Sequence, residues 1–145
     1  HLDLSSHNLG PAPPALSQAL HSYFAVSDIR QVAVRGLDGC RYIETLEDWQ
    51  EKRQQGELSF AGETDRIYLD VPARQTLTCA AGRVAIDSDA SCAVVWNAWS
   101  NDKNIADLGE GNHVGYLCVE RCDVADRAIT LTPGGEYRMT MTLSY

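Results

Sequence analysis

The C-terminal stretch of the chain alternates strictly between large apolar and polar side chains. The apolar positions are Tyr137, Met139, Met141, Leu143 and Tyr145, and the polar positions between them are Arg138, Thr140, Thr142 and Ser144. Successive side chains of a β-strand point to opposite faces of its sheet. A period of two therefore predicts a half-buried strand of an antiparallel sheet.

Short apolar runs separated by Gly, Pro, Asn and Asp continue this pattern along the rest of the chain. Residues 31–35 and 40–44 flank Gly-Leu-Asp-Gly, which predicts one hairpin, and residues 76–79 and 83–87 flank Ala-Ala-Gly, which predicts a second. With no repeat and no linker, the chain is expected to be a single all-β domain over residues 1–145, an antiparallel β-sandwich of stacked sheets.

Two segments depart from the strand pattern. The charged segment 45–56 is interpreted as a surface loop or helical turn, and so is 101–111, where Ile105 and Leu108 are spaced as in one helical turn.

The glycines of the chain belong to turns, and none forms a phosphate-binding or dinucleotide-binding motif. No nucleophile elbow of the Gly-x-Ser-x-Gly type occurs either. We expect no cofactor.

Charge and composition narrow the function further. A net charge of −8 in 145 residues disfavours nonspecific binding to nucleic acid or to an anionic membrane, since both require a basic surface. No apolar run is long enough to cross a bilayer, and no basic-then-apolar leader is present. The five cysteines are odd in number and scattered, which predicts reduced thiols in a cytoplasmic protein. Cys118, Cys122 and His113 do not complete a zinc motif, and buried packing is the favoured interpretation of the two thiols.

Three ionisable residues lie inside segments that otherwise have the composition of a core. They are His21 in Ala-Leu-His-Ser-Tyr-Phe, Asp65 in Thr-Asp-Arg-Ile-Tyr, and Glu120 in Cys-Val-Glu. Burying such a group costs free energy unless it is paired or faces a wet cleft, so we expect one shared site. Arg121 is a poor partner for Glu120, because adjacent strand residues point to opposite faces.

The roles open to these residues follow from their chemistry. His21 sits among apolar and aromatic neighbours that can tune an imidazole, whereas His1, His7 and His113 are interpreted as ordinary residues. Glu120 could act as a general base. Asp65 could equally join an ion pair or accept hydrogen bonds from sugar hydroxyls. The aromatic segment Trp96-Asn97-Ala98-Trp99 is expected to pack, with sugar stacking as the alternative.

Taken in order, these motifs resemble the aldose 1-epimerase superfamily, and within it the hexose-6-phosphate mutarotases (glucose-6-phosphate 1-epimerases). The resemblance implies a supersandwich of the galactose mutarotase type, of which 145 residues form about the C-terminal half; the start at His1 without a methionine agrees with this expectation. It also implies that His21 is the general acid, that Glu120 is the general base, and that Asp65 holds sugar hydroxyls. The implied partner is a sugar phosphate, and the whole protein would be a monomer.

Two departures from the family pattern stand out. Ala98 replaces the proline usual between the tryptophans, and Arg121 and Cys122 follow the glutamate where small residues are usual. The phosphate-binding residues of this branch lie largely in the N-terminal half, so no arginine of this chain is given that role; those considered are Arg30, Arg35, Arg41 and Arg66. Three alternatives stay open: a mutarotase of unphosphorylated aldoses, a noncatalytic carbohydrate-binding sandwich, and a structural fragment that folds only with its other half.

Overall fold

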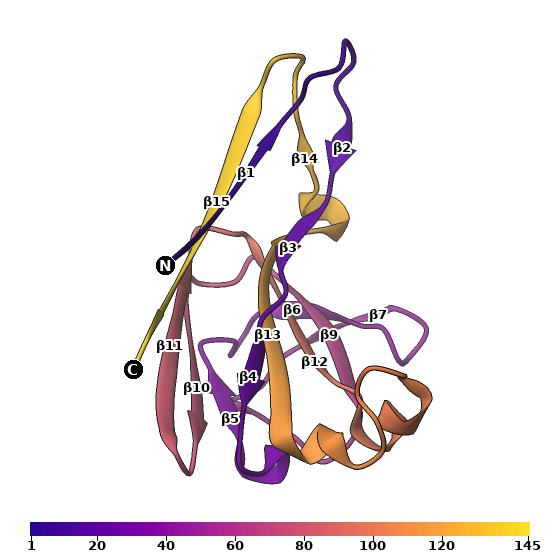
Figure 1. The fold of residues 1–145 in the computed structure, drawn as a ribbon, viewed down its shortest axis with the longest axis vertical. Helices are drawn as coiled ribbons and strands as arrows, with labels where there is room; N and C mark the ends of the chain where they lie inside the picture. Colours follow the sequence, from indigo (N-terminus) through magenta and orange to yellow (C-terminus); the bar gives the residue numbers. More distant parts are fainter.

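The computed structural model describes residues 1–145 as two antiparallel sheets and a short two-stranded ribbon (Figure 1). The six-stranded sheet has the order β1 (Leu2–His7), β15 (Glu136–Ser144), β11 (Gly82–Ser88), β10 (Arg74–Cys79), β5 (Ala33–Arg35), β8 (Leu58–Ser59). The seven-stranded sheet has β3 (Gln18–Leu20) and β4 (Tyr23–Ala25) both on β13 (Tyr116–Asp123), followed by β12 (Cys92–Asn97), β9 (Thr64–Leu69), β6 (Arg41–Glu44) and β7 (Gln50–Arg53). The predicted all-β class is confirmed.

The remaining elements are short. The ribbon pairs β2 (Ala15–Leu16) with β14 (Ile129–Thr130), and the 3-10 helices are η1 (Ile29–Gln31), η2 (Trp99–Asn104), η3 (Asn112–Gly115) and η4 (Ala125–Arg127). None of these helices has the length and apolar character that a bilayer crossing requires. In the segment 101–111, the spacing of Ile105 and Leu108 corresponds to one turn, closed by the Leu108 N–H donating to the Ile105 carbonyl over 3.0 Å.

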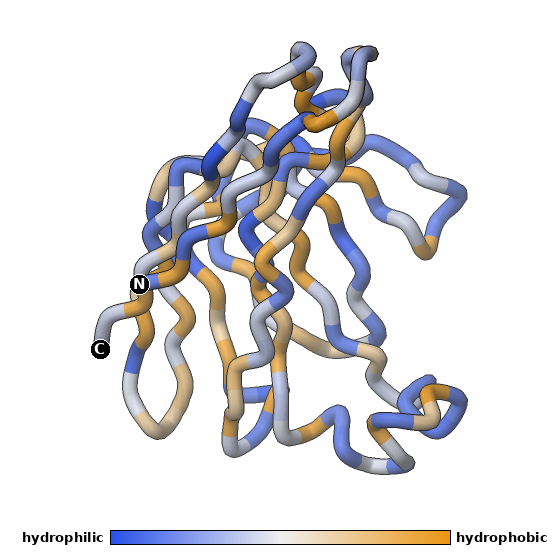
Figure 2. Tube along the Cα trace, turned by 45° about the horizontal axis from the view of Figure 1, so that its top comes forward, coloured by the Kyte–Doolittle hydropathy of each residue, from blue (hydrophilic) through white to orange (hydrophobic).

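The core lies between the two sheets. Its fully buried side chains include Leu77, Ile86 and Met141 from the six-stranded sheet and Val95 and Leu117 from the seven-stranded sheet. Figure 2 shows the alternation of apolar and polar stretches along the strands that this arrangement requires. In β15 the predicted alternation is confirmed, since Met139 and Met141 are buried, while Tyr145 follows the strand and is 98% exposed.

Of the two predicted hairpins, only the second is confirmed. β10 and β11 pair antiparallel up to Cys79 opposite Gly82. The first prediction is wrong, because β5 and β6 belong to different sheets. The chain leaves β5 at Gly36, whose φ of +90° is a left-handed conformation and whose missing Cβ would lie 2.5 Å from the Arg74 carbonyl oxygen. Leu37 then enters the core.

β6 lies between β9 and β7, and its hairpin partner is β7, in register from Arg41 opposite Arg53 to Glu44 opposite Gln50. β7 lies inside the segment 45–56 that the sequence presents as a loop, so that interpretation is wrong for residues 50–53. Its sequence, Gln-Glu-Lys-Arg, has no apolar alternation, because β7 is the sheet's edge strand and its side chains are mostly exposed.

Candidate active site

The seven-stranded sheet places His21 opposite Glu120. β3 and β4 pair with β13 in one continuous register, interrupted only at His21 and Ser22. The Ser22 carbonyl still accepts from the Val119 N–H over 3.3 Å, so the interruption does not shift the strands. In this register His21 faces Glu120, and its Nε2 lies 3.2 Å from the Glu120 Oε1.

Asp65 lies on the same face of the sheet, one row away. Tyr23, Cys118, Trp96 and Asp65 are successive cross-strand partners on β4, β13, β12 and β9. Side chains of directly opposed residues share a face, and so do residues two apart on one strand. Glu120 is two residues from Cys118, so the acidic and imidazole side chains all occupy the face that points away from the core. The structure therefore brings the three predicted site residues onto one surface, with His21 and Glu120 in contact.

Burial changes the acidity of Glu120. Its side chain is 8% exposed, whereas that of His21 is half exposed. Burial, reinforced by the negative charge of Asp65, raises the pKa of Glu120 to about 7. A protonated imidazole on His21 acts in the opposite direction, because it favours the carboxylate. The pair thus joins a carboxyl group that can exchange a proton near neutral pH to an imidazole open to solvent.

Aromatic rings line the same face. The His21 and Tyr23 rings are stacked, with centroids 5.0 Å apart and planes 10° from parallel. The Trp96 ring lies edge-on to both, with centroids 6.5 Å from His21 and 6.3 Å from Tyr23, and Tyr116 packs against Tyr23 and Trp96. Trp96 therefore packs, as expected, and does so beside the imidazole and carboxyl groups.

The other residues of the aromatic segment are structural. Asn97 is fully buried and donates to the carbonyls of His113 and Tyr116 over 3.0 and 2.9 Å, and its Oδ1 accepts from the Trp99 N–H. The Trp99 ring packs on the core and on the His113 ring. His113 is held by buried Asp102, whose Oδ2 lies 2.7 Å from Nδ1. These contacts anchor the loop between β12 and β13.

Arg121 has a role that the sequence did not assign. As predicted from its position, it turns away from Glu120, and its fully buried guanidinium lies between the sheets. Nη1 donates to the Pro72 carbonyl over 3.1 Å and to the Gln75 side-chain oxygen, and Nη2 donates to the Ala90 carbonyl. The signal was present in the sequence, because a neighbour of a residue on the outer face must point inward.

The cysteines are free thiols. Burial raises the pKa of Cys118 and of Cys122 well above the usual range, so both thiols stay protonated and behave as small packing groups. No three His, Cys, Asp or Glu side chains form a group that could hold a metal ion.

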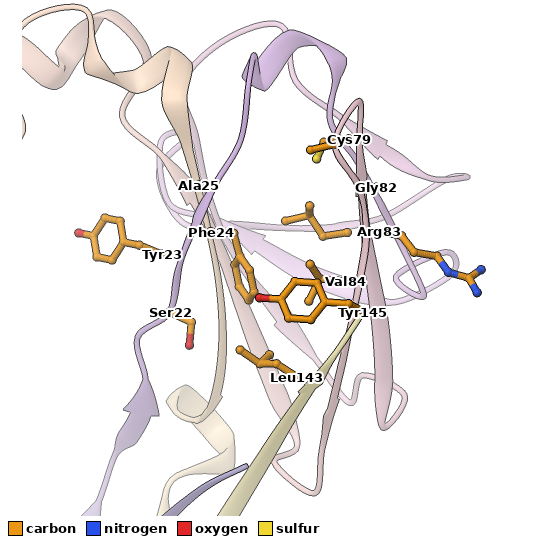
Figure 3. A pocket seen from close by; sticks show the side chains of 12 residues that line it. Ser22, Tyr23, Phe24, Ala25, Cys79, Gly82, Arg83, Val84, Leu143 and Tyr145 are labelled. Carbon is orange, nitrogen blue, oxygen red and sulfur yellow. The ribbon is translucent and has the colours of Figure 1, made fainter.

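A separate cavity of about 690 Å³ opens between the sheets, beside β4 and the ends of β11 and β15 (Figure 3). Phe24, Leu143 and Tyr145 point into it, whereas the Tyr23 ring points away from it. Most of its lining residues are apolar. The largest cavity is thus on the other side of β4 from the His21 and Glu120 pair.

The family model and the curated relatives that match this chain all concern sugar 1-epimerases. The family model described as Aldose 1-epimerase matches residues 1–144. A protein of Cenchrus ciliaris named "Putative glucose-6-phosphate 1-epimerase" is 34% identical over 142 residues, which cover 94% of this chain and 43% of that protein. One of the same name from Salmonella typhimurium is 33% identical over 111 residues, covering 73% of this chain and 37% of that protein.

Solved structures confirm the fold. The crystal structure of a "putative mutarotase (YeaD)" from Salmonella typhimurium superposes with a TM-score of 0.80 at 25% identity, covering 98% of this chain and 49% of that one. A "putative aldose 1-epimerase" from Escherichia coli K12 superposes with a TM-score of 0.72 at 16% identity, covering 99% and 55%. The chain therefore spans about half the length of the solved structures and less than half that of these curated relatives.

Proposed function

Because the chain belongs to the aldose 1-epimerase family, we propose that His21 and Glu120 interconvert the α and β anomers of a hexose 6-phosphate, glucose 6-phosphate above all. The observation that carries the proposal is the 3.2 Å contact between Nε2 and Oε1, made by two residues placed opposite each other in the sheet. An acid and a base so close together can reach both oxygens of one hemiacetal carbon.

The reaction needs only proton transfers. Glu120 takes the proton of the anomeric hydroxyl while His21 protonates the ring oxygen, the bond between the ring oxygen and C1 breaks, and the open-chain aldehyde forms. Rotation about C1–C2 and reclosure on the other face of the carbonyl give the second anomer: His21 takes back the proton of the ring oxygen, and Glu120 gives its proton to the carbonyl oxygen, which becomes the new anomeric hydroxyl. Each positioned acid or base contributes typically about 10²–10⁴-fold to the rate. Asp65, on the same face, accepts hydrogen bonds from the sugar hydroxyls.

Unphosphorylated aldoses are a second candidate substrate class, because of how the arginines of this chain are paired. The four arginines considered for phosphate binding all pair with carboxylates: Arg30 with Asp28, Arg35 with Glu57, Arg41 with Glu51 and Asp70, and Arg66 with Glu44. None offers an uncompensated charge to an anion. These four arginines therefore give no support to phosphate binding within this chain, which leaves an aldose without phosphate as a second candidate, while the names of the curated relatives favour the phosphorylated sugar.

The experiment is an NMR exchange measurement of anomer interconversion for glucose 6-phosphate and for glucose. It uses this chain and a chain of the relatives' length that contains it, with His21→Ala and Glu120→Ala variants of each. Both variants are expected to lose activity by at least about 10²-fold. His7→Ala is the matched control, because His7 and Glu136 form a similar but exposed pair, 3.6 Å apart, on β1 and β15. Rates equal to buffer in every unsubstituted chain would refute the proposal, and a faster rate on glucose would select the second substrate class.

We also propose that residues 1–145 are one sandwich unit at the C-terminal end of a larger mutarotase domain in the cytoplasm. The doubled length of the solved relatives and the open apolar cavity beside β4 support this arrangement, and the five free thiols support a reducing compartment. Leu143→Asp, in the cavity, should destabilise a chain of the relatives' length more than the 145-residue chain, because only the longer chain covers that position. Equal losses in urea unfolding would contradict the larger domain.

A further inference from the structure

Tyr23 is unusual among the aromatic residues of the outer face. It lies in β4, at the edge of the sheet, and is 55% exposed although its neighbour Phe24 is buried in the core. It is also the ring that stacks parallel to the imidazole of His21, whereas Trp96 meets that imidazole edge-on. A half-exposed tyrosine on an edge strand gains little from burial, and among its three ring contacts the one with His21 is the parallel stack.

His21 needs such a contact. It lies in the gap between β3 and β4, its side chain is half exposed, and its polar contact with protein is the one to Glu120. A single contact at one ring nitrogen leaves the imidazole free to rotate about that contact. The parallel stack on Tyr23 and the edge contact with Trp96 restrict this rotation of the imidazole, because the two rings contact it from two sides.

The charged and titratable neighbours of the imidazole come from two strands. Glu120 faces it from β13 and Tyr23 from β4. Cys118 lies opposite Tyr23 on β13, and Asp65 acts on Glu120 from β9. Burial and the nearby Cys118 and Glu120 raise the pKa of Tyr23, so its ring is neutral near neutral pH. A neutral ring can stack on the imidazole without placing a further charge beside it.

We propose that Tyr23 is a positioning residue for the acid and base pair: its ring holds the His21 imidazole with Nε2 toward Glu120. This inference rests on the proposed anomerisation for its catalytic consequence. Its structural part, the orientation of the imidazole, does not depend on any activity. The ring carries the role and the hydroxyl does not, which makes phenylalanine the conservative replacement.

The test compares Tyr23→Phe with Tyr23→Leu by imidazole ¹⁵N NMR of His21 and by the kcat and KM of anomer interconversion. Phenylalanine should preserve the ¹⁵N shifts and kcat within about twofold. Leucine should move the Nε2 signal toward that of a free imidazole and lower kcat about tenfold with little change in KM, because misplacing one catalytic group is felt mainly in the chemical step. Trp49→Leu is the control, since Trp49 is an exposed aromatic of the turn between β6 and β7.

The outcomes separate the two proposals. Unchanged ¹⁵N shifts in Tyr23→Leu would overturn the positioning role, and so would equal losses in the phenylalanine and leucine variants, because the hydroxyl would then be the active group. If the unsubstituted chain shows no anomerisation, the proposed function fails while the NMR comparison still decides whether Tyr23 orients His21. Urea unfolding of both variants identifies any loss that comes from destabilisation.

Discussion

At the scale of single residues, Glu120 is a carboxyl group whose ionised form is destabilised by its surroundings. It is buried next to Asp65 on the same face, and its pKa of about 7 means that the protein pays a free energy to ionise it. The unfolded chain releases this proton near the ordinary value of 4.5, whereas the folded chain keeps it up to about pH 7. Glu120 therefore lowers stability progressively as the pH rises between these values and lowers it fully above them.

Replacing Glu120 with its neutral isostere should reverse this penalty. Glu120→Gln is expected to gain stability relative to the parent by about 2 kcal/mol as the pH rises from about 5 to about 8, because a glutamine has no proton to lose. Urea unfolding at the two pH values measures the difference. A gain that does not change with pH would show that the carboxyl group of Glu120 titrates at its ordinary value in the folded protein.

The sequence was sufficient to identify the candidate site at this scale, because a buried strand rarely contains an ionisable residue without a reason. His21, Asp65 and Glu120 were found by that argument, and the structure brings them to one face. The stack of Tyr23 on His21 was not predictable, since it depends on β3 and β4 sharing one register across two unpaired residues. The catalytic roles of His21, Asp65 and Glu120 stay a prediction.

At the scale of elements, the sequence predicted strands better than their partners. The alternation in β15 and the short turn between β10 and β11 are local signals, and both predictions are confirmed. Whether β5 and β6 share a sheet depends on the backbone at Gly36, where a close approach to the Arg74 carbonyl directs the chain to the other layer. A turn sequence does not reveal such a long-range contact.

Gly36 should therefore tolerate no side chain. Gly36→Ala is expected to destabilise the fold by about 1–3 kcal/mol, because its φ is positive and the added Cβ would meet a backbone oxygen that has little room to move. Gly62→Ala is the matched control, since nothing lies within 4 Å of a Cβ there. Thermal unfolding compares the two, and similar losses would mean that the close approach is unimportant.

Arg121 connects the elements behind the candidate site. Arg121→Met should cost about 2–4 kcal/mol in urea unfolding, because the carbonyls of Pro72 and Ala90 and the side chain of Gln75 would lose their buried donor. Arg138→Met, which removes a surface pair with Asp3, should change the midpoint much less. Comparable shifts in the two variants would show that the buried guanidinium contributes no more than a surface charge.

At the scale of the whole molecule, the net charge of −8 of this chain would oppose the anionic substrate that we propose. Raising the ionic strength from about 0.01 to about 0.1 M shortens the Debye length from about 30 to about 10 Å. The KM for glucose 6-phosphate should therefore fall with added salt, while that for glucose stays constant. Steady-state measurements on both sugars check this, and a KM for the phosphorylated sugar that rises with salt would reveal a strongly basic subsite.

If His21 and Glu120 carry the proposed activity, their pairing between β13 and the segment that joins β3 to β4 makes that activity a measure of correct folding. Because β-sheet side chains alternate, a slip of β3 and β4 by one residue against β13 would turn one member of the pair to the opposite face and leave two well-formed strands behind. Spectra that measure only β content would miss this error. The proposed turnover would detect it, so the specific activity of a preparation would count the molecules whose edge strand has docked in the correct register.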